Sequence, residues 1–277
     1  MNNIKFSKFH GCGNDFVVIG PEDTQLIKIN KYKDFAVQIL DRHFGIGGDG
    51  LMLINSIAGN IVNCFMLNPD GSHMGMCGNG VRCVASYSCE LANVNNLTVK
   101  IFEGRDVFVT KINDNRFSVK MGQPEFTPEE IPCLFSSTSP IENFPNYFPE
   151  AKAVFALSMG NPHLIFIVNE NTNELCLKYG PIFEYSKYFP KRTNVEFVQV
   201  LSQDHIKVDV WERGAGKTLA CGTGACAAAI AAIRAGHCSA EVKVTLPGGD
   251  MQVFWDHDGE VVLTGEAVRI YDGVVKV

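Results

Sequence analysis

The first half of the chain is made of short segments in which apolar and polar residues alternate. Residues 4–10 alternate in this way, pass through a glycine-containing turn at 11–15, and continue into the apolar run 16–19. A period of two is typical of strands that bury one face. The chain is therefore predicted to open with a β-hairpin.

A helical period interrupts these strands. Residues 32–44 carry apolar side chains three and four positions apart, and Gly45 follows them. This spacing predicts a helix that ends near the glycine. Further strands are predicted over residues 51–55, 61–67, 97–102, 106–112 and 117–121.

Two cysteine segments have matching patterns. Residues 77–83 begin Cys-Gly-Asn-Gly, and residues 221–226 begin Cys-Gly-Thr-Gly. Each leads from a glycine-rich turn into a run compatible with a helix, over residues 81–91 and 225–234. Alanine dominates the second run and is the strongest helix former. Two helices, each preceded by a cysteine, are predicted.

A cysteine at the start of a helix lies beside backbone N–H groups that have no acceptor within the helix. Such positions favour thiolate, with pKa values of about 3.5 to 7.5 against about 8.5 for a free thiol. The neighbouring glycines let a carboxylate approach the same N–H groups. Each turn is therefore predicted to hold an anionic substrate and to present a proton-accepting sulfur.

The two halves of the chain share landmarks in the same order. The offsets are 147 for Asn14 and Asn161, 144 for Cys77 and Cys221, 145 for Leu97 and Val242, and 143 for Gly122 and Gly265. A nearly constant offset is the mark of a duplicated domain.

The duplication predicts a mixed α/β protein of the α+β class. Two pseudo-symmetric domains are expected to face each other, each with a strand-rich, mostly antiparallel sheet or barrel around a central helix. The expected domains are 1–124, which carries Cys77, and 125–266, which carries Cys221. The proline-rich span 124–149 is the expected junction.

Composition narrows the class of partner. The chain has 277 residues, 46% hydrophobic and 19% charged, with a net charge of -6. Nucleic acids and anionic membranes attract basic surfaces, so neither is an expected partner. The longest apolar run, 225–233, is far shorter than the roughly 18 residues of a membrane span. The N-terminus lacks the apolar core of a signal peptide, so we expect a cytoplasmic protein with reduced thiols.

Three interpretations of the cysteine pair remain open. One thiolate could remove a proton from a carbon while the opposed thiol delivers one to the other face, which inverts a stereocentre. The two sulfurs could instead form a redox disulfide, or both could be structural. Zinc fits poorly because no Cys-x-x-Cys pair is present, and no metal is expected.

Several motifs resemble one known family over nearly the whole chain. They are residues 6–16, Cys77-Gly78-Asn79-Gly80, Ser158-Met159-Gly160-Asn161-Pro162-His163, Arg192 to Phe197, Trp211 to Gly216, and Ala220 to Cys226. In this order they resemble the diaminopimelate epimerases. The resemblance implies an amino-acid epimerase without pyridoxal phosphate or another cofactor. Such an enzyme interconverts LL- and meso-diaminopimelate on the route to lysine and peptidoglycan.

The resemblance also implies roles for individual residues. Cys77 and Cys221 would be the acid/base pair, and His163 and Glu212 would tune their pKa values. The residues implied to bind the substrate are Asn14, Asn68, Gly78, Asn79, Asn161, Asn194, Glu212, Arg213, Gly222 and Thr223. Those at 78–79 and 222–223 would hold the reacting carboxylate through backbone N–H groups.

Physical chemistry agrees with these roles. An α-proton beside a free carboxylate is weakly acidic, so preorganised donors must stabilise the developing charge. Arg213 can bind a distal carboxylate in a bidentate way, and Glu212 can accept a distal ammonium group. Both residues favour an acyclic diamino diacid over the substrate of a proline racemase, the nearest alternative. A thiol–disulfide sensor is the alternative from another class.

The resemblance has two implications for assembly. The C-terminal strand, 267–277, is expected to return to the first domain. A homodimer is also expected, with Tyr271 as a possible contact.

Overall fold

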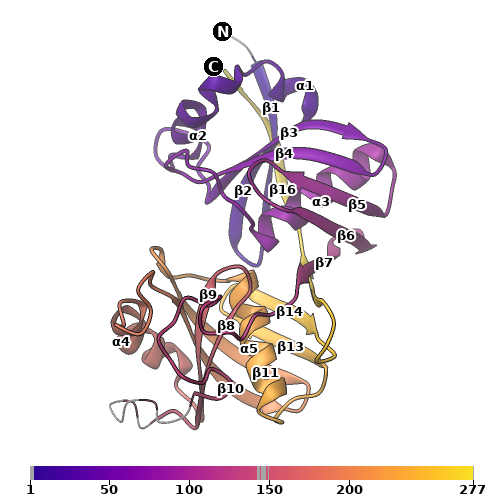
Figure 1. Cartoon of the computed structure of the whole chain (residues 1–277). Helices are drawn as coiled ribbons and strands as arrows, with labels where there is room; N and C mark the ends of the chain where they lie inside the picture. Colours follow the sequence, from indigo (N-terminus) through magenta and orange to yellow (C-terminus); the bar gives the residue numbers. More distant parts are fainter. Residues whose placement is uncertain (1–2, 142–143, 145–147, 149, 277) are drawn as a thin grey trace. The chain divides into compact units, whose positions relative to one another are not determined.

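The computed structural model of the chain describes residues 3–141, 144, 148 and 150–276 (Figure 1). Two compact units are present: Met1–Lys120 with Thr264–Val277, and Met121–Leu263. The chain thus passes between the units twice. Of the expected junction and final strand, Pro145, Pro149 and Val277 lie outside the described residues.

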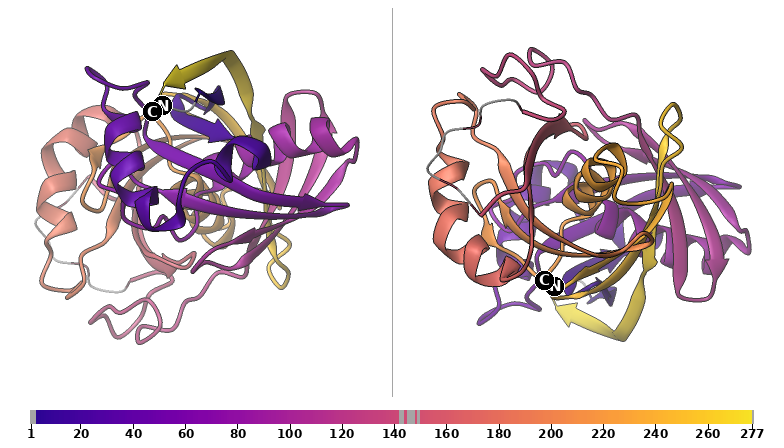
Figure 2. Two further views of the ribbon diagram at one scale, coloured as in Figure 1. Left: turned by 90° about the horizontal axis from the view of Figure 1, so that it is seen from above. Right: turned by 90° about the horizontal axis from the view of Figure 1, so that it is seen from below.

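Unit 1 holds the first strands and the last strand of the chain. Its elements are β1 (Asn3–Gly11), β2 (Asn14–Ile19), α1 (Pro21–Thr24), η1 (Ile29–Lys31), α2 (Tyr32–Leu40), β3 (Gly50–Ala58), β4 (Ile61–Leu67), α3 (Gly78–Ala92), β5 (Asn96–Ile101), β6 (Asp106–Asn113), most of β7 (Arg116–Gly122), and β16 (Val268–Lys276). The strand order is β16-β1-β2-β3-β4-β5-β6-β7. Because Asn3 pairs with Lys276, the two ends of the chain lie side by side (Figure 2).

Unit 2 is one continuous piece of chain. Its elements are β8 (Ala153–Ser158), β9 (Pro162–Val168), α4 (Thr172–Glu184), β10 (Asn194–Ser202), β11 (His205–Glu212), β12 (Gly216–Lys217), α5 (Gly222–Arg234), β13 (Glu241–Leu246) and β14 (Gly249–Phe254). The strand β15 (Val261–Glu266) then leads the chain back into unit 1. The strand order of unit 2 is β15-β14-β13-β11-β10-β9-β8, and β12 pairs with β11.

The two units repeat the same order of elements and the same strand directions. In unit 1, β2 pairs in parallel with β3 and β4 with β5, whereas the other pairs described within its sheet are antiparallel. In unit 2, β9 pairs in parallel with β10 and β11 with β13, at the corresponding places. The predicted α+β class with two similar halves is confirmed.

A central helix is packed within each sheet. Helix α3 contacts β1, β2, β3, β5 and β6, and α5 contacts strands β8 to β11, β13 and β14. Every residue of α5 from Ala225 to Ala232 is fully buried. A helix that is apolar all round is typical of such a position. No helix in the described part of the chain is long and apolar enough to cross a membrane.

A second helix in each unit packs away from the central one. Helix α2 was predicted over 32–44 but ends at Leu40. Asp41 is extended, and its carboxylate accepts hydrogen bonds from the backbone N–H groups of His43 and Phe44. This local turn competes with the helix. Helix α4 was not predicted, and it packs on β10 and β11 against a cluster rich in phenylalanine.

Candidate active site

Both candidate acid/base cysteines are the N-cap residues of the central helices. Cys77 precedes α3 with φ −131° and ψ 109°, and Cys221 precedes α5 with φ −124° and ψ 116°. The carbonyl oxygen of each accepts the first helical hydrogen bond, from Val81 at 2.8 Å and from Ala225 at 2.9 Å. The two predicted helices are present, but they begin at Gly78 and Gly222, three residues before the predicted runs that start at 81 and 225. Each sulfur thus lies beside the N–H groups of a first turn.

In unit 1, Asn14 links Cys77 to Asn79. Its Oδ1 atom accepts a hydrogen bond from Asn79 Nδ2 at 3.3 Å, and Cys77 Sγ lies 3.8 Å from the same oxygen. Asn14 comes from the start of β2, whereas Asn79 is in the first turn of α3. The turn between β1 and β2 thus brings an amide to the cysteine.

Two charged residues fix the direction of this amide chain. A guanidinium group can only donate, so Asn79 turns its Oδ1 to Arg82 Nη2 at 2.8 Å and its Nδ2 to Asn14. A carboxylate can only accept, so Asn14 turns its Nδ2 to Asp49 Oδ2 at 2.7 Å. The two ends together leave Asn14 with its carbonyl oxygen toward the thiol.

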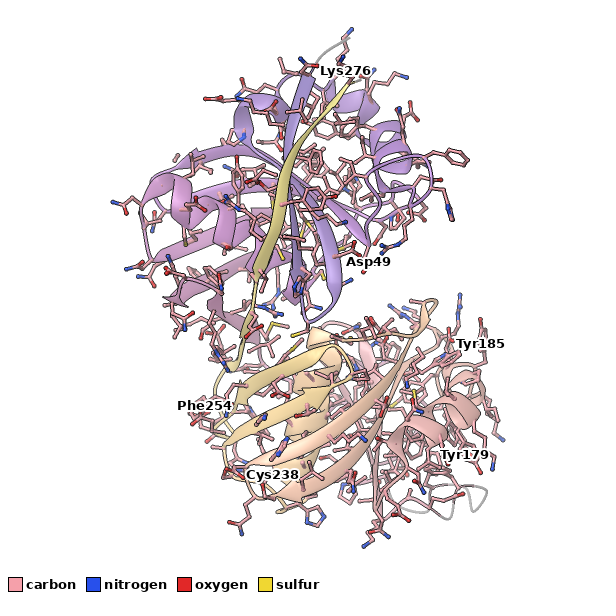
Figure 3. All side chains as sticks on the ribbon, turned by 180° about the vertical axis from the view of Figure 1, so that it is seen from behind. Asp49, Tyr179, Tyr185, Cys238, Phe254 and Lys276 are labelled. Atoms are coloured by element: carbon pink, nitrogen blue, oxygen red, sulfur yellow. The ribbon has the colours of Figure 1, made fainter. Side chains whose placement is uncertain are left out.

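Asp49 lies on the loop before β3 (Figure 3), where charged side chains from other segments of unit 1 hold it. Arg42 donates to Asp49 at 2.7 Å and to Asp15 at 2.6 Å, and Lys8 contacts Asp15 at 2.6 Å. Burial alone would raise the pKa of Asp15, but hydrogen bonds from Arg42 and Lys8 lower it to about 2.

Asn68 occupies a different place from the other unit 1 candidates. It follows β4 in a turn, where its Nδ2 donates to Ser72 Oγ at 3.0 Å. Asp70 accepts from the same hydroxyl group, so the turn is closed by side chains. The hydrogen bonds described for Asn68 thus belong to this turn and do not join it to Asn14.

In unit 2, a chain of hydrogen bonds ends on Cys221. Asn161 Nδ2 donates to Thr223 Oγ1 at 3.4 Å, and Thr223 Oγ1 lies 3.5 Å from Cys221 Sγ. The backbone N–H of Gly224 also donates to this sulfur, at 3.4 Å. The Thr223 and Gly224 contacts stabilise the thiolate form of Cys221.

The other end of this series of hydrogen bonds is a buried pair of titratable residues, His163 and Glu196. His163 Nε2 is 3.0 Å from Asn161 Oδ1, and its Nδ1 is 2.6 Å from Glu196 Oε1. Both side chains are completely buried. A Cβ atom added at Gly224 would lie 2.9 Å from Glu196 Oε1 and 3.4 Å from Cys221 Sγ. The carboxyl and thiol groups therefore line the same small space.

The expectation that Cys221 has a low pKa is wrong. Burial, aided by the Glu212 and Glu196 carboxyl groups, raises its pKa well above the ordinary value. Thr223 and the Gly224 N–H act in the opposite direction and do not overcome burial. Cys221 is only 6% exposed, so little water solvates a thiolate. The expected influence of Glu212 on this pKa is present.

The remaining unit 2 candidates lie at the ends of β10 and β11. Asn194 is buried, donates to Pro162 O at 3.0 Å and accepts from the backbone N–H of Arg213 at 2.9 Å. Its amide therefore positions Arg213, whose own side chain is exposed. Glu212 is half-buried and accepts from Thr218 Oγ1.

Three polar residues of the site were missed by the sequence analysis. Glu196 has apolar neighbours on both sides in β10, Arg82 is buried within α3, and Asp49 directly precedes β3. A charged residue inside an apolar run was the available signal for Glu196, since buried charges need partners.

Of the eight other cysteines, seven are buried and Cys238 is half-buried. None of the ten cysteines forms a disulfide. Burial raises the pKa of Cys64 and of Cys176 to about 12, as expected for core thiols. Among the residues that the structure describes, no group of three or more His, Cys, Asp or Glu side chains could hold a metal ion.

Comparison with known proteins identifies a family. The family model for diaminopimelate epimerase matches residues 6–127 and 155–270. The diaminopimelate epimerase of Synechococcus elongatus is 38% identical over 277 residues, with 98% of each chain covered. That of Carboxydothermus hydrogenoformans is 40% identical over 272 residues, again with 98% of each covered.

Solved structures share the fold at low sequence identity. A Bacillus anthracis phenazine biosynthesis protein of the PhzF family has a TM-score of 0.73 at 14% identity, covering 100% of both chains. A hydroxyproline epimerase from Agrobacterium vitis has a TM-score of 0.60 at 14% identity, covering 99% of this chain and 92% of that one. From the family match and these relatives, the chain belongs to the diaminopimelate epimerase family and is an isomerase of the racemase and epimerase class.

Proposed function

We propose that the chain interconverts LL- and meso-diaminopimelate without a cofactor, as a step of lysine and peptidoglycan precursor biosynthesis. Cys77 and Cys221 are the acid/base pair. The observation that carries this proposal is their equivalence: each is the extended N-cap of the central helix in one of two repeated units. Ten free cysteines suit a reducing cytoplasm, where we place the reaction.

The proposed reaction moves one proton off the substrate and another onto it. One cysteine, as thiolate, takes the α-proton and becomes a thiol. The other, as thiol, gives its proton to the opposite face of the same carbon and becomes a thiolate. The configuration inverts, and the cysteine pair again holds a single proton, now on the cysteine that began as the thiolate.

Stabilisation of the carbanionic intermediate is assigned to the helix starts. The α-carboxylate takes up negative charge when the α-proton leaves. Backbone N–H groups at Gly78, Asn79, Gly222 and Thr223 are in first turns, where no intrahelical acceptor exists. These donors supply the stabilisation for which other enzymes use pyridoxal phosphate.

The distal end of the substrate is assigned to β11 and the turn after it. Arg213 is exposed and its backbone is held by Asn194, so its guanidinium can form a bidentate pair with a carboxylate. The half-buried Glu212 can accept from the distal ammonium group. Asn14, Asn68, Asn79 and Asn161 complete the proposed set of polar contacts.

The test is solvent-hydrogen exchange in deuterium oxide. Reduced wild type is incubated with LL-diaminopimelate, and α-deuterium and stereoisomers are followed by NMR and chiral chromatography. We expect deuterium in the meso product. Cys77→Ser and Cys221→Ser should each slow interconversion by at least about 100-fold, because each removes one proton carrier.

The controls separate the reaction from folding. Circular dichroism must show that both variants are folded. Cys238→Ser, a change in a half-buried cysteine outside the site, should interconvert the isomers at the wild-type rate. No exchange in folded, reduced wild type would contradict the proposal.

A further inference from the structure

The hydrogen bonds around His163 require a proton count that is unusual for a histidine beside a carboxylate. Asn161 Oδ1 faces Nε2 at 3.0 Å, and Glu196 Oε1 faces Nδ1 at 2.6 Å. Neutral imidazole has one donor and one acceptor nitrogen, whereas an amide oxygen can only accept. Nε2 must therefore carry a hydrogen. Nδ1 then either carries another or accepts one from a protonated Glu196.

Both possibilities leave the couple neutral and holding one proton more than a neutral histidine beside a carboxylate. Its surroundings favour this state. Glu196 is completely buried, and among the described residues its Oε2 has no hydrogen-bond partner. An ionised carboxylate oxygen in that position is strongly disfavoured. Burial likewise raises the pKa of Glu196, against the opposing effect of His163.

The His163–Glu196 pair also determines which groups donate and which accept in the hydrogen bonds that lead to Cys221. Because Asn161 turns its oxygen to His163, its Nδ2 donates to Thr223 Oγ1 at 3.4 Å. The hydroxyl oxygen of Thr223 is then an acceptor for Asn161, so its own hydrogen is available for Cys221 Sγ at 3.5 Å.

We propose that Glu196 is a positioning residue: with His163 it holds a buried proton that directs the Asn161–Thr223 hydrogen bonds toward Cys221. The inference rests on the proposed function for its catalytic meaning, since Cys221, whose thiolate form Thr223 stabilises, is one member of the proposed acid/base pair. When the couple loses its proton, His163 keeps a hydrogen only on Nδ1. Asn161 must then donate to the bare Nε2, and Thr223 turns its hydrogen away from the sulfur.

Other titratable groups face the couple from the elements packed around it. Glu212 of β11 raises the pKa of both Glu196 and Cys221, and Glu196 acts in turn on Cys221 at the start of α5. Burial raises the pKa of Cys176 in α4 to about 12, and the charge of Glu196 acts in the same direction, so Cys176 stays a thiol. The test must therefore observe His163 directly and separately from the cysteines.

Nitrogen NMR of the full chain, with 15N-labelled histidine, makes this observation without substrate. In wild type at neutral pH we expect His163 Nε2 to carry a hydrogen. In Glu196→Gln, the amide can donate to Nδ1, so Nε2 should keep its hydrogen. His205, whose Nε2 lies 2.9 Å from Thr245 Oγ1, is the internal reference.

Two further variants test the direction of the hydrogen bonds from His163 to Cys221. Thr223→Val should leave the His163 signals unchanged but slow alkylation of Cys221 by about tenfold at a fixed pH below its pKa, the effect of one pKa unit. Asp209→Asn changes another buried carboxylate of unit 2, whose partners are Thr172 and Lys217, and should leave both readouts unchanged.

Either of two results would overturn the inference. One is a bare Nε2 on His163 in wild type at neutral pH. The other is an alkylation rate of Cys221 that is the same in wild type and Thr223→Val. Neither measurement depends on diaminopimelate, so failure of the epimerase assay and failure of this inference are distinguishable.

Discussion

At the scale of single residues, Cys221 shows two opposing influences on one thiol. The Gly224 N–H and the Thr223 hydroxyl favour thiolate, while burial and two carboxyl groups favour thiol. Burial has the largest effect because an isolated buried charge loses nearly all of its hydration. In the absence of substrate, Cys221 is thus a thiol at neutral pH. The sequence pattern of a cysteine at a helix start could not reveal this, because it does not show how deeply the sulfur is buried.

The pH dependence of alkylation tests this state of Cys221. Because only thiolate reacts, the rate with iodoacetamide should still be rising at about pH 9. Glu212→Gln removes the larger of the two carboxylate contributions and should shift the profile to lower pH. Mass spectrometry of the peptide that contains Cys221 gives the rates. Glu241→Gln, an exposed change on β13, should leave the profile in place. A plateau below about pH 8 would contradict the raised pKa.

Asp15 illustrates the opposite case, in which partners outweigh burial. Its pKa is lowered from 3.8 to about 2. A carboxyl group whose pKa is lower in the folded state stabilises the fold above its unfolded pKa. That stabilisation is lost as the pH falls through the folded value.

Urea unfolding of Asp15→Asn at several pH values measures this contribution. Relative to wild type, we expect a loss of unfolding free energy that is full above about pH 5 and disappears as the pH falls toward 2. The control is Asp34→Asn, which removes an exposed pair with Lys31 and should cost less than about 1 kcal/mol at every pH. A pH-independent difference for Asp15→Asn would show that its charge is not the cause.

At the scale of elements, local patterns located the central helices but not what surrounds them. Glycine-rich turns followed by helix-forming residues located α3 and α5 to within three residues of their starts, because both signals are local. The shortened α2 depends on a side chain, Asp41, that takes over backbone hydrogen bonds.

The partner of His163 could not be predicted from local sequence for a different reason. β10 runs parallel to β9, with Asn194 opposite His163. This register joins segments separated by a helix, and no pattern within either strand encodes it. Period-two alternation places Asn194 and Glu196 on one face of β10, but it does not say that this face meets a histidine.

Helix α5 is expected to tolerate little change in volume. Ala228 is completely buried, with the sheet of unit 2 packed around the helix. Ala228→Leu adds three carbon atoms where no space exists and should lower the unfolding free energy by about 1–3 kcal/mol in urea titrations. Ala92→Leu, at the half-buried end of α3, should change it by less than about 0.5 kcal/mol. Equal effects would mean that α5 is loosely packed.

At the scale of the whole molecule, β16 is an exposed edge. It ends the strand order of unit 1, and its Ile270, Tyr271 and Val274 side chains are 51%, 47% and 60% exposed. Edge strands with apolar side chains are ready sites for pairing with another chain. We propose that two copies associate through β16, with Tyr271 in the contact and its ring supported edge-on by Phe6 at 5.9 Å.

Sedimentation velocity tests this association. Wild type should sediment as a dimer, and Tyr271→Glu should shift it toward monomer because the carboxylate would be buried without a partner. Tyr185→Glu alters another exposed tyrosine, in unit 2, and should leave the dimer intact. A monomeric wild type, or a dimer unchanged by Tyr271→Glu, would rule out this surface.

The pairing of β1 with β16 has a consequence for synthesis on the ribosome. β1 of unit 1 is made before all of unit 2, yet it has no β16 beside it until residues 268–276 have emerged. Unit 2 is one continuous segment that ends at Leu263. Although domains generally fold from the N-terminus onward during translation, here unit 2 can close its sheet before unit 1 has received its last strand.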